Sequence, residues 1–463
     1  MPELVRRWRG PLSYMAMLAA TLAAFTWIAA PAGSNVLAPA PPAAASAFPA
    51  STLLHVLLAL AAVIVLARLL GALFRRVHQP PVIGEVVAGL ALGPSVLGAL
   101  SPGAQAFIFP AAVMPFLSAL AQVGVIVFMF LVGLELDPAA IRKRLGQTLA
   151  IAHASMALPF VLGAALAVPL HRLAPAGVGL PLFALFVGVA MSVTAFPVLA
   201  RILTDRNLQT SPLGVTALSC AAVGDATAWC LLAIVVAIAR AEPGRGLITL
   251  ALAAVYTLTM LAAVRPLVQR WVRRHDGQGL TRARMALALI AVLLSALATE
   301  AIGIHAIFGA FFLGALVPHD SRIARELRAR VEDFVLILLL PAFFAFTGLR
   351  TKIGLLDSAQ DWLLCGAIVA VATLGKFGGA TLAGRLTGMR WREASIIGAL
   401  MNTRGLMELI VLNVGLDLGV ISPILFAMMV IMAVATTLAT TPVLDWLRGA
   451  RGTRDTAATE QLP

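Results

Sequence analysis

Residues 179–203 read GLPLFALFVGVAMSVTAFPVLARIL, an apolar stretch without a charged residue before Arg201. An α-helix of about 20 apolar residues crosses a hydrocarbon core about 30 Å thick, so this stretch predicts a membrane-spanning segment. Pro197 lies inside it, and a proline within a helix removes one backbone hydrogen bond and clashes with the preceding turn. We therefore expect a membrane helix that is broken near Ser192, Thr194 and Pro197.

The rest of the chain repeats this apolar pattern. Of its 463 residues, 60% are hydrophobic and 12% are charged, far below the roughly 25% charged residues of a typical soluble domain. Prolines, glycines and charge clusters divide the chain into fourteen apolar segments, which begin near residues 11, 52, 81, 113, 146, 179, 211, 247, 283, 303, 331, 361, 392 and 421. The predicted fold class is an all-α polytopic membrane protein.

The distribution of basic residues predicts the orientation of these segments, because Lys and Arg concentrate in the cytoplasmic loops of membrane proteins. Most of the 34 Lys and Arg fall on one side, in the N-terminus, in alternate loops and in the tail. The other side holds Arg172, Arg240, Arg245, Arg350 and Lys352. We expect a multi-pass protein of the cell inner membrane with a cytoplasmic C-terminus. Orientation and lipid contact also explain the net charge of +13, so no nucleic-acid partner is expected.

The chain divides into three regions. Residues 1–50 hold a hydrophobic segment, residues 11–30, and a Pro/Ala linker, and they form either an extra helix or a cleaved signal peptide. Residues 51–446 are expected to form the membrane domain, and residues 447–463 a short cytoplasmic tail. Cys220, Cys230 and Cys365 lie in apolar runs without CxxC spacing, so we interpret them as packing residues. No cofactor is expected.

One carboxylate lies in the middle of an apolar segment. Asp225 belongs to the stretch SCAAVGDATAWC, residues 219–230. Burial disfavours the ionised form of a carboxylate, so such a group can hold either a proton or a dehydrated alkali cation near neutral pH. Competition between these two ligands is the minimal machinery of exchange. The alternative is a structural aspartate that is satisfied by serine or threonine hydroxyls.

A second broken helix is predicted by residues 401–405, MNTRG, which place polar residues and a glycine in another apolar segment. The two broken segments run in opposite directions through the membrane, as the inverted repeat of a transporter requires, and their free backbone groups would line an ion site. The residues expected to line the breaks are Ser192, Pro197, Asn402, Thr403 and Gly405, and the polar centre is expected to gather Thr194, Asp225, Lys376 and Asn402. The alternative is that Pro197 only kinks its helix and that Gly405 only lets helices pack.

Other ionisable residues also lie within apolar segments. Lys376 is expected to neutralise Asp225 or to bind carbonyls freed at a helix break, rather than to extend to the membrane surface. Glu408 follows Arg404 by four residues on the same helical face, so we expect an intrahelical ion pair with a structural or gating role. Residues near segment ends are expected to serve packing or interfaces, namely Glu85, Glu135, Asp137, Glu300 and His305.

Five motifs resemble those of the cation:proton antiporter superfamily, in its second branch of Kef-type and plant CHX-like exchangers. They are GEVVAGLALGPSVLG (residues 84–98), FLVGLELD (130–137), SVTAFPVLARIL (192–203), GIHAIFGAFFLG (303–314) and MNTRGLMELIVLNVG (401–415). The resemblance implies 13 core transmembrane helices with inverted repeats and two broken helices, preceded here by one extra N-terminal hydrophobic segment. It also implies a homodimer, with a transport core of about residues 146–239 and 361–446 that moves against a dimerisation part formed by the remainder.

The resemblance further implies that Asp225 carries the cation and the proton, that Thr194 lies where the broken helices cross, and that Lys376 lies beside the site. One position departs from the family, because Gly224 stands where Asn, Asp or Gln usually precedes the essential aspartate. In the family, a paired Asp goes with electrogenic exchange and Asn with electroneutral exchange. With a single carboxylate, we expect one proton per cation.

The expected function is secondary active antiport, not enzymatic catalysis. The protein would exchange a monovalent cation, Na⁺ or K⁺, for H⁺ across the lipid bilayer by alternating access at Asp225, and the only metal there would be the transported alkali cation. A cation channel and a non-transporting membrane sensor are the alternatives. An intramembrane aspartyl protease needs two aspartates that share a site, and its Gly-x-Gly-Asp form is absent because Ala222 occupies the first position.

Overall fold

The computed structural model describes residues 50–135, 145–209, 211–240 and 246–449, and the regular secondary structure of these residues is helical. Eleven helices are long and apolar enough to cross a membrane, or up to twelve when a bent pair of helices is counted as one span. The chain is therefore a multi-pass membrane protein. The hydrophobic segment at residues 11–30, most of the Pro/Ala linker, the tail after residue 449 and the loop at residues 136–144 lie outside the described residues.

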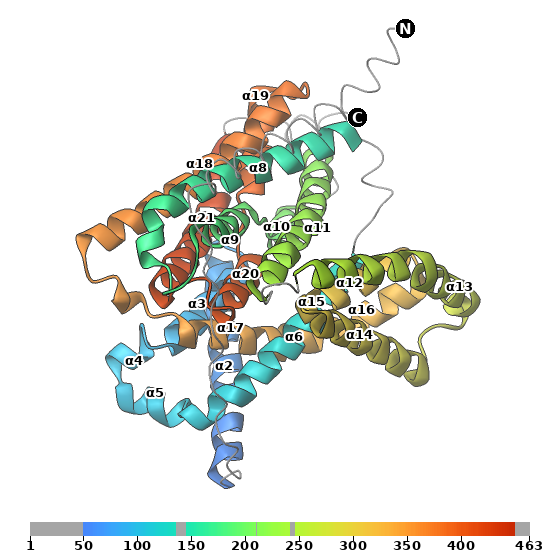
Figure 1. Ribbon diagram of the computed structural model, residues 1–463, viewed down its shortest axis with the longest axis horizontal. Helices are drawn as coiled ribbons and strands as arrows, with labels where there is room; N and C mark the ends of the chain where they lie inside the picture. The colour runs from blue at the N-terminus through green and yellow to red at the C-terminus, as the bar shows by residue number, and fades with distance from the viewer. Residues whose placement is uncertain (1–49, 136–144, 210, 241–245, 450–463) are drawn as a thin grey trace, which may run out of the picture.

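The described helices pack as two bundles (Figure 1). The first bundle is formed by α2 (Ala50–Arg76), α3 (Pro81–Leu92), α4 (Leu97–Leu100), α5 (Pro102–Ile108), α6 (Met114–Leu134), α12 (Gly246–Thr259), α13 (Arg265–His275), α14 (Arg282–Ile302), α15 (Ala306–Leu316), α16 (Arg322–Phe334) and α17 (Leu340–Arg350). The second bundle is formed by α8 (Leu145–Leu170), α9 (Leu180–Ser192), α10 (Phe196–Asp205), α11 (Pro212–Arg240), α18 (Ala359–Leu386), α19 (Trp391–Met401), α20 (Leu406–Asp417) and α21 (Pro423–Arg448). One turn of π-helix joins α12 to α13 and another joins α16 to α17.

Small residues let helices of the first bundle approach closely. α3 crosses α17 at Gly89 and Gly348, where a Cβ added to Gly348 would lie 2.0 Å from the carbonyl oxygen of Gly89. The crossing of α6 and α15 is built in the same way, because a Cβ added to Gly314 would lie 2.3 Å from the carbonyl oxygen of Phe130. Glycine at such crossings brings backbones together and increases van der Waals contact in a medium where no hydrophobic force drives helices together.

Two of the expected segments take a shorter or broken form. The segment expected near residue 303 is α15, an apolar helix of 11 residues that falls below the length of a full span. The segment expected near residue 392 is the pair α19 and α20, whose axes differ in direction by 45°. The count of 13 core helices therefore stays a prediction.

Both expected breaks are present in the second bundle. α9 ends at Ser192, residues 193–195 are not helical, and α10 begins at Phe196. Pro197 therefore lies in the first turn of α10, where a proline is tolerated because the amide hydrogen it lacks would have no helical partner. α19 ends at Met401 and α20 begins after Gly405, whose φ of +139° is a backbone conformation that favours glycine.

Candidate functional site

The two breaks cross in the interior of the second bundle, and their backbones contact each other directly. The amide of Ala195 donates to the carbonyl oxygen of Thr403 at 2.9 Å. The hydroxyl of Thr194 donates to the carbonyl oxygen of Met401 at 3.3 Å. Thr194 and Thr403 are buried. The crossing thus joins two stretches that are separated by about half of the chain.

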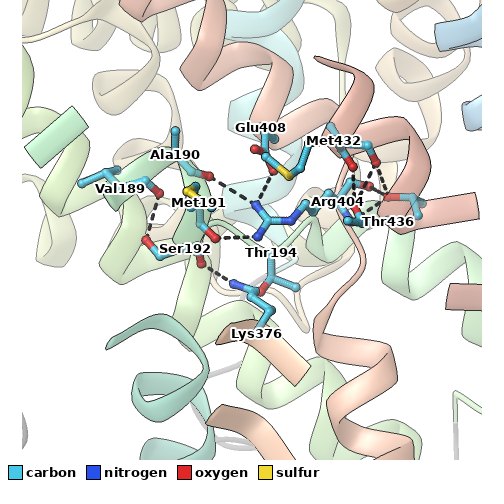
Figure 2. Close-up of polar contacts among 12 residues, drawn as sticks. Val189, Ala190, Met191, Ser192, Thr194, Lys376, Arg404, Glu408, Met432 and Thr436 are labelled. Atoms are coloured by element: carbon cyan, nitrogen blue, oxygen red, sulfur yellow. Dashed lines mark hydrogen bonds and ion pairs between the residues drawn. The ribbon is translucent and has the colours of Figure 1, made fainter. Parts of the chain in front are cut away.

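Side chains satisfy the last four carbonyl groups of α9, which have no partner within their own helix. The hydroxyl of Ser192 donates to Val189, at 2.8 Å. The guanidinium of Arg404 donates to Ala190 and Met191, at 3.3 and 2.5 Å, and the ammonium of Lys376 donates to the carbonyl oxygen of Ser192. Figure 2 shows Arg404 and Lys376 side by side at this helix end. Cations are favourable there because the C-terminus of a helix carries a partial negative charge.

The end of α19 is satisfied by residues of the breaks themselves. The backbone amide of Asn402 donates to Gly398 and Ala399, both at 3.2 Å. The hydroxyl of Thr403 donates to the carbonyl oxygen of Leu400 at 2.7 Å, and the hydroxyl of Thr194 donates to that of Met401. The last four carbonyl groups of α9 and of α19 therefore all have donors, so these carbonyl groups do not require water or a ligand.

Arg404 and Glu408 form the expected ion pair, with 2.6 Å between Nη1 and Oε2, and both side chains are fully buried. Their placement differs from the prediction. Arg404 lies in the break, two residues before α20 begins, and Glu408 lies in the first turn of that helix. The pair is therefore not intrahelical: it connects the start of α20 to the end of α9 through the guanidinium. A carboxylate in a first turn also lies where the helix dipole favours negative charge.

Asp225 lies in the middle of α11 and is 2% exposed. Neither carboxylate oxygen has a hydrogen-bond partner among the described residues. The groups that act on it electrostatically are the ammonium of Lys376 and the backbone amide of Phe196, at the start of α10. The interpretation of Asp225 as a structural residue bound by hydroxyls is not what the structure shows. A buried acceptor without a donor is costly, and the side-chain oxygen of Asn402 at the crossing also lacks a donor.

The remaining expected residues take backbone roles. Lys376 is fully buried and reaches a freed carbonyl, so it does not extend to the membrane surface. Pro197 and Gly405 shape the breaks and bring no ligand atom of a side chain. Gly224 is buried, and a Cβ added there would lie in ordinary van der Waals contact with the sulfur of Met156, at 3.7 Å, so the position accepts a Cβ without a clash.

Sequence reasoning missed Thr437 of α21. Its hydroxyl contacts both the amide and the carbonyl of Arg404, each at 2.9 Å, and it also donates to Ala433. It therefore holds the backbone of the second break against α21. The available signal was the run TTLATT at residues 436–441, an unusual density of hydroxyls in an apolar helix.

Comparisons with known proteins show the family to which the chain belongs. The family model described as "Sodium/hydrogen exchanger, transmembrane" matches residues 59–447. The chain belongs to this family. The chain is 48% identical over 399 residues to the Na⁺/H⁺ antiporter NhaS4 of Synechocystis, with 85% of this chain and 97% of that protein aligned. It is 38% identical over 385 residues to the K⁺/H⁺ antiporter 1 of Saccharomyces cerevisiae, covering 80% of this chain and 44% of that longer protein.

A solved structure shows the same fold. The sodium proton antiporter MjNhaP1 of Methanocaldococcus jannaschii matches this chain with a TM-score of 0.62 and 13% sequence identity. The match covers 85% of this chain and 99% of that one. At this identity the likeness supports the arrangement of helices alone.

Proposed function

We propose that this chain is a secondary antiporter that exchanges Na⁺ or K⁺ for H⁺ at Asp225. The observation that carries the proposal is a carboxylate that is 2% exposed, has no hydrogen-bond partner among the described residues and lies near the start of α10, at the crossing of two helix breaks. An ionised carboxylate offers an alkali cation a negative charge and two acceptor oxygens, whereas protonation removes the charge and converts one oxygen into a donor. Binding of the two ligands is therefore mutually exclusive, which is what exchange requires.

The surrounding charges support a single exchangeable site. The charge of Arg404 is compensated by Glu408 and by carbonyl groups at the end of α9. Lys376 is the cation that acts on Asp225. The oxygens of Asn402 and Asp225 that lack donors are the ligand atoms we assign to the cation, with Thr194 beside them. Arg404 and Glu408 then hold the breaks together and do not bind the transported ion.

Alternating access requires one part of the protein to move against another. Both breaks and Asp225 belong to the second bundle, so we propose that this bundle is the transport unit and that the first bundle remains in place, with dimerisation as its further role. The segment count predicts that the two broken segments run in opposite directions, and on this basis we propose an inverted repeat within a core of 13 helices. The names of the two relatives divide between Na⁺ and K⁺, and either ion is compatible with an oxygen-lined site.

Exchange is measured in proteoliposomes loaded with a pH-sensitive dye, to which Na⁺, K⁺ or Li⁺ is added. Wild-type protein should release protons in response to its cation, and Asp225→Asn should abolish the response. The matched control is Asp205→Asn, which makes the same substitution at the exposed end of α10, where Asp205 pairs with Arg201 at 3.2 Å. Equal responses in wild type and Asp225→Asn would remove Asp225 from the mechanism, and cation flux without proton movement would indicate a channel.

The stoichiometry is proposed to be one proton per cation. Gly224 supplies no second carboxylate next to Asp225. The reversal potential of exchange, measured with the pH and cation gradients clamped, distinguishes one proton from two. A value that requires two protons would refute this part of the proposal while leaving antiport itself intact.

A further inference from the structure

Ion pairs join the two bundles at the helix ends that lie opposite the arginine-rich loops. α17 of the first bundle ends at Arg350, and α20 of the second bundle ends at Asp417. Their side chains form an ion pair of 2.6 Å. A second ion pair, of 2.8 Å, joins Arg240 at the end of α11 to Glu300 near the end of α14. Each pair therefore links one helix of the first bundle to one helix of the second.

Asn413 links α17 and α20 one turn deeper. Its amide nitrogen donates to the hydroxyl of Thr347 at 2.8 Å, and its amide oxygen accepts from Arg350 at 3.1 Å. Asn413 is 5% exposed and Thr347 is 2% exposed. The guanidinium of Arg350 also lies 5.0 Å from the centre of the Phe346 ring in its own helix. Arg350 is thus held by its own bundle and contacts the other bundle at two residues.

The strength of these contacts suits a connection that forms and breaks. The Asp417 side chain is 48% exposed and the Arg350 side chain 19%, and an ion pair with one partner so exposed contributes little. The buried hydrogen bonds of Asn413 matter more, because a buried amide that loses its partners without gaining water is destabilised. Separation of the helices admits water to these groups, so the connection can open.

A small cavity lies directly behind this connection, between the bundles. Its volume is about 40 Å³, and its walls include His305 and Gln122 from the first bundle and Ile410, Val414 and Asp417 from α20. Such a volume accepts a few water molecules. α20 runs from this cavity to the break at Gly405, so the cavity lies on the path from the helix ends towards the crossing.

At the opposite end of the bundle interface no ion pair within 4 Å joins the bundles among the described residues, although Arg201 acts on Glu85 and His78 acts on Asp445 through their charges. There Gln79, which follows α2, donates to the carbonyl oxygen of Leu438 in α21 at 3.3 Å. This is a neutral hydrogen bond between a side chain and the backbone. The ionic connections described above lie at the other end, which the loop charges assign to the outside.

We propose that Arg350, Asp417 and Asn413 form a gate that closes the Asp225 site towards the face opposite the basic loops. Its contacts break when the second bundle moves to open the site to that face, and Arg240 with Glu300 adds a second connection of the same kind. The inference rests on the proposed antiport, since a protein that transports nothing has no need to separate these helices. The gate residues would determine to which side of the membrane the Asp225 site is open.

The first test measures access without measuring transport. Val414→Cys places a thiol in the cavity wall, in a protein whose native cysteines are replaced by alanine and which is embedded in lipid nanodiscs. Reaction with a membrane-impermeant maleimide should be slow, and Arg350→Gln or Asp417→Asn should accelerate it by about threefold to tenfold, as expected for the loss of one weak ion pair and its hydrogen bonds. Arg328→Gln, which breaks ion pairs inside the first bundle, should leave the rate unchanged. The charge-reversed double variant Arg350→Asp with Asp417→Arg should restore slow labelling. Equal labelling rates in the parent protein and in both single gate variants would overturn the proposal.

The second test fixes the gate shut. The side chains of Thr347 and Asn413 are in hydrogen-bond contact, so the double variant Thr347→Cys with Asn413→Cys should form a disulfide on oxidation. The oxidised protein should lose exchange, and a reductant should restore it. Full exchange by the oxidised protein would refute the gate while leaving antiport established. If the reduced variant is also inactive, the labelling rates decide the question, because they do not depend on transport.

Discussion

Replacing Arg404 and Glu408 together should destabilise the protein by less than the sum of the effects of the two single replacements. Both side chains are fully buried and 2.6 Å apart. Arg404→Met leaves a buried carboxylate without its partner, and Glu408→Met leaves a buried guanidinium without its partner. Breaking a buried pair on one side costs about 3 to 5 kcal/mol, so the two single effects would add to roughly 6 to 10 kcal/mol.

The double variant leaves no unpaired charge. What remains is the loss of donors to the carbonyl groups of Ala190 and Met191, at about 1 to 3 kcal/mol for each unsatisfied group. The double effect should therefore be smaller than the sum of the single effects by about 4 kcal/mol. This coupling is measured as a double-mutant cycle of unfolding free energies in detergent micelles. Additive effects would show that the pair and the α9 carbonyls are not one unit and would refute this account of the crossing.

Three further predictions concern packing, pH and transport. Gly348→Ala should lower the unfolding temperature in detergent, because its Cβ would collide with the Gly89 carbonyl. The control Gly366→Ala should not, since no atom lies within 4 Å of the added Cβ. Equal effects of the two variants would contradict the close crossing of α3 and α17. Burial raises the pKa of Glu135, so the folded protein binds this proton more tightly than the unfolded one. The stability of wild type relative to Glu135→Gln should therefore fall as the pH rises above about 4, the usual pKa of a glutamate. A constant difference in unfolding temperature would exclude this effect. Lys376→Met removes the donor to the end of α9 and the charge beside Asp225. It should therefore slow proton-coupled cation exchange at least about tenfold. An unchanged rate would show that Lys376 serves packing alone.

The sequence was sufficient to predict the membrane class and both helix breaks, because each rests on local chemistry. Runs of apolar residues need no partner to be recognised as spans. Pro197 and Gly405 mark the breaks because each imposes a backbone restriction of its own. The structure moves the first break slightly upstream of Pro197, since a proline is tolerated in the first turn of the following helix.

What the sequence could not predict is which side chain meets which helix end. Arg404 and Glu408 were expected to pair within one helix, and spacing alone could not show that α20 begins after Arg404. Likewise, no local pattern relates Thr437 to Arg404 or Asn413 to Thr347, because these contacts depend on how distant helices pack. The apolar residues at 303–314 predict a span, and the helix they form, α15, has 11 residues, so the sequence did not predict its length.

The charges at the crossing bear on how exchange responds to voltage. With all groups ionised, Asp225 and Glu408 balance Lys376 and Arg404, so the empty site is neutral. A proton on Asp225 or a monovalent cation bound to it adds one positive charge in either case, provided that Lys376 keeps its proton. Both loaded forms then carry the same charge across the membrane, in opposite directions, and a complete cycle moves no net charge. A single carboxylate beside one lysine is therefore sufficient for electroneutral exchange, and Gly224 fits this scheme because a second carboxylate at that position would make the empty site negative.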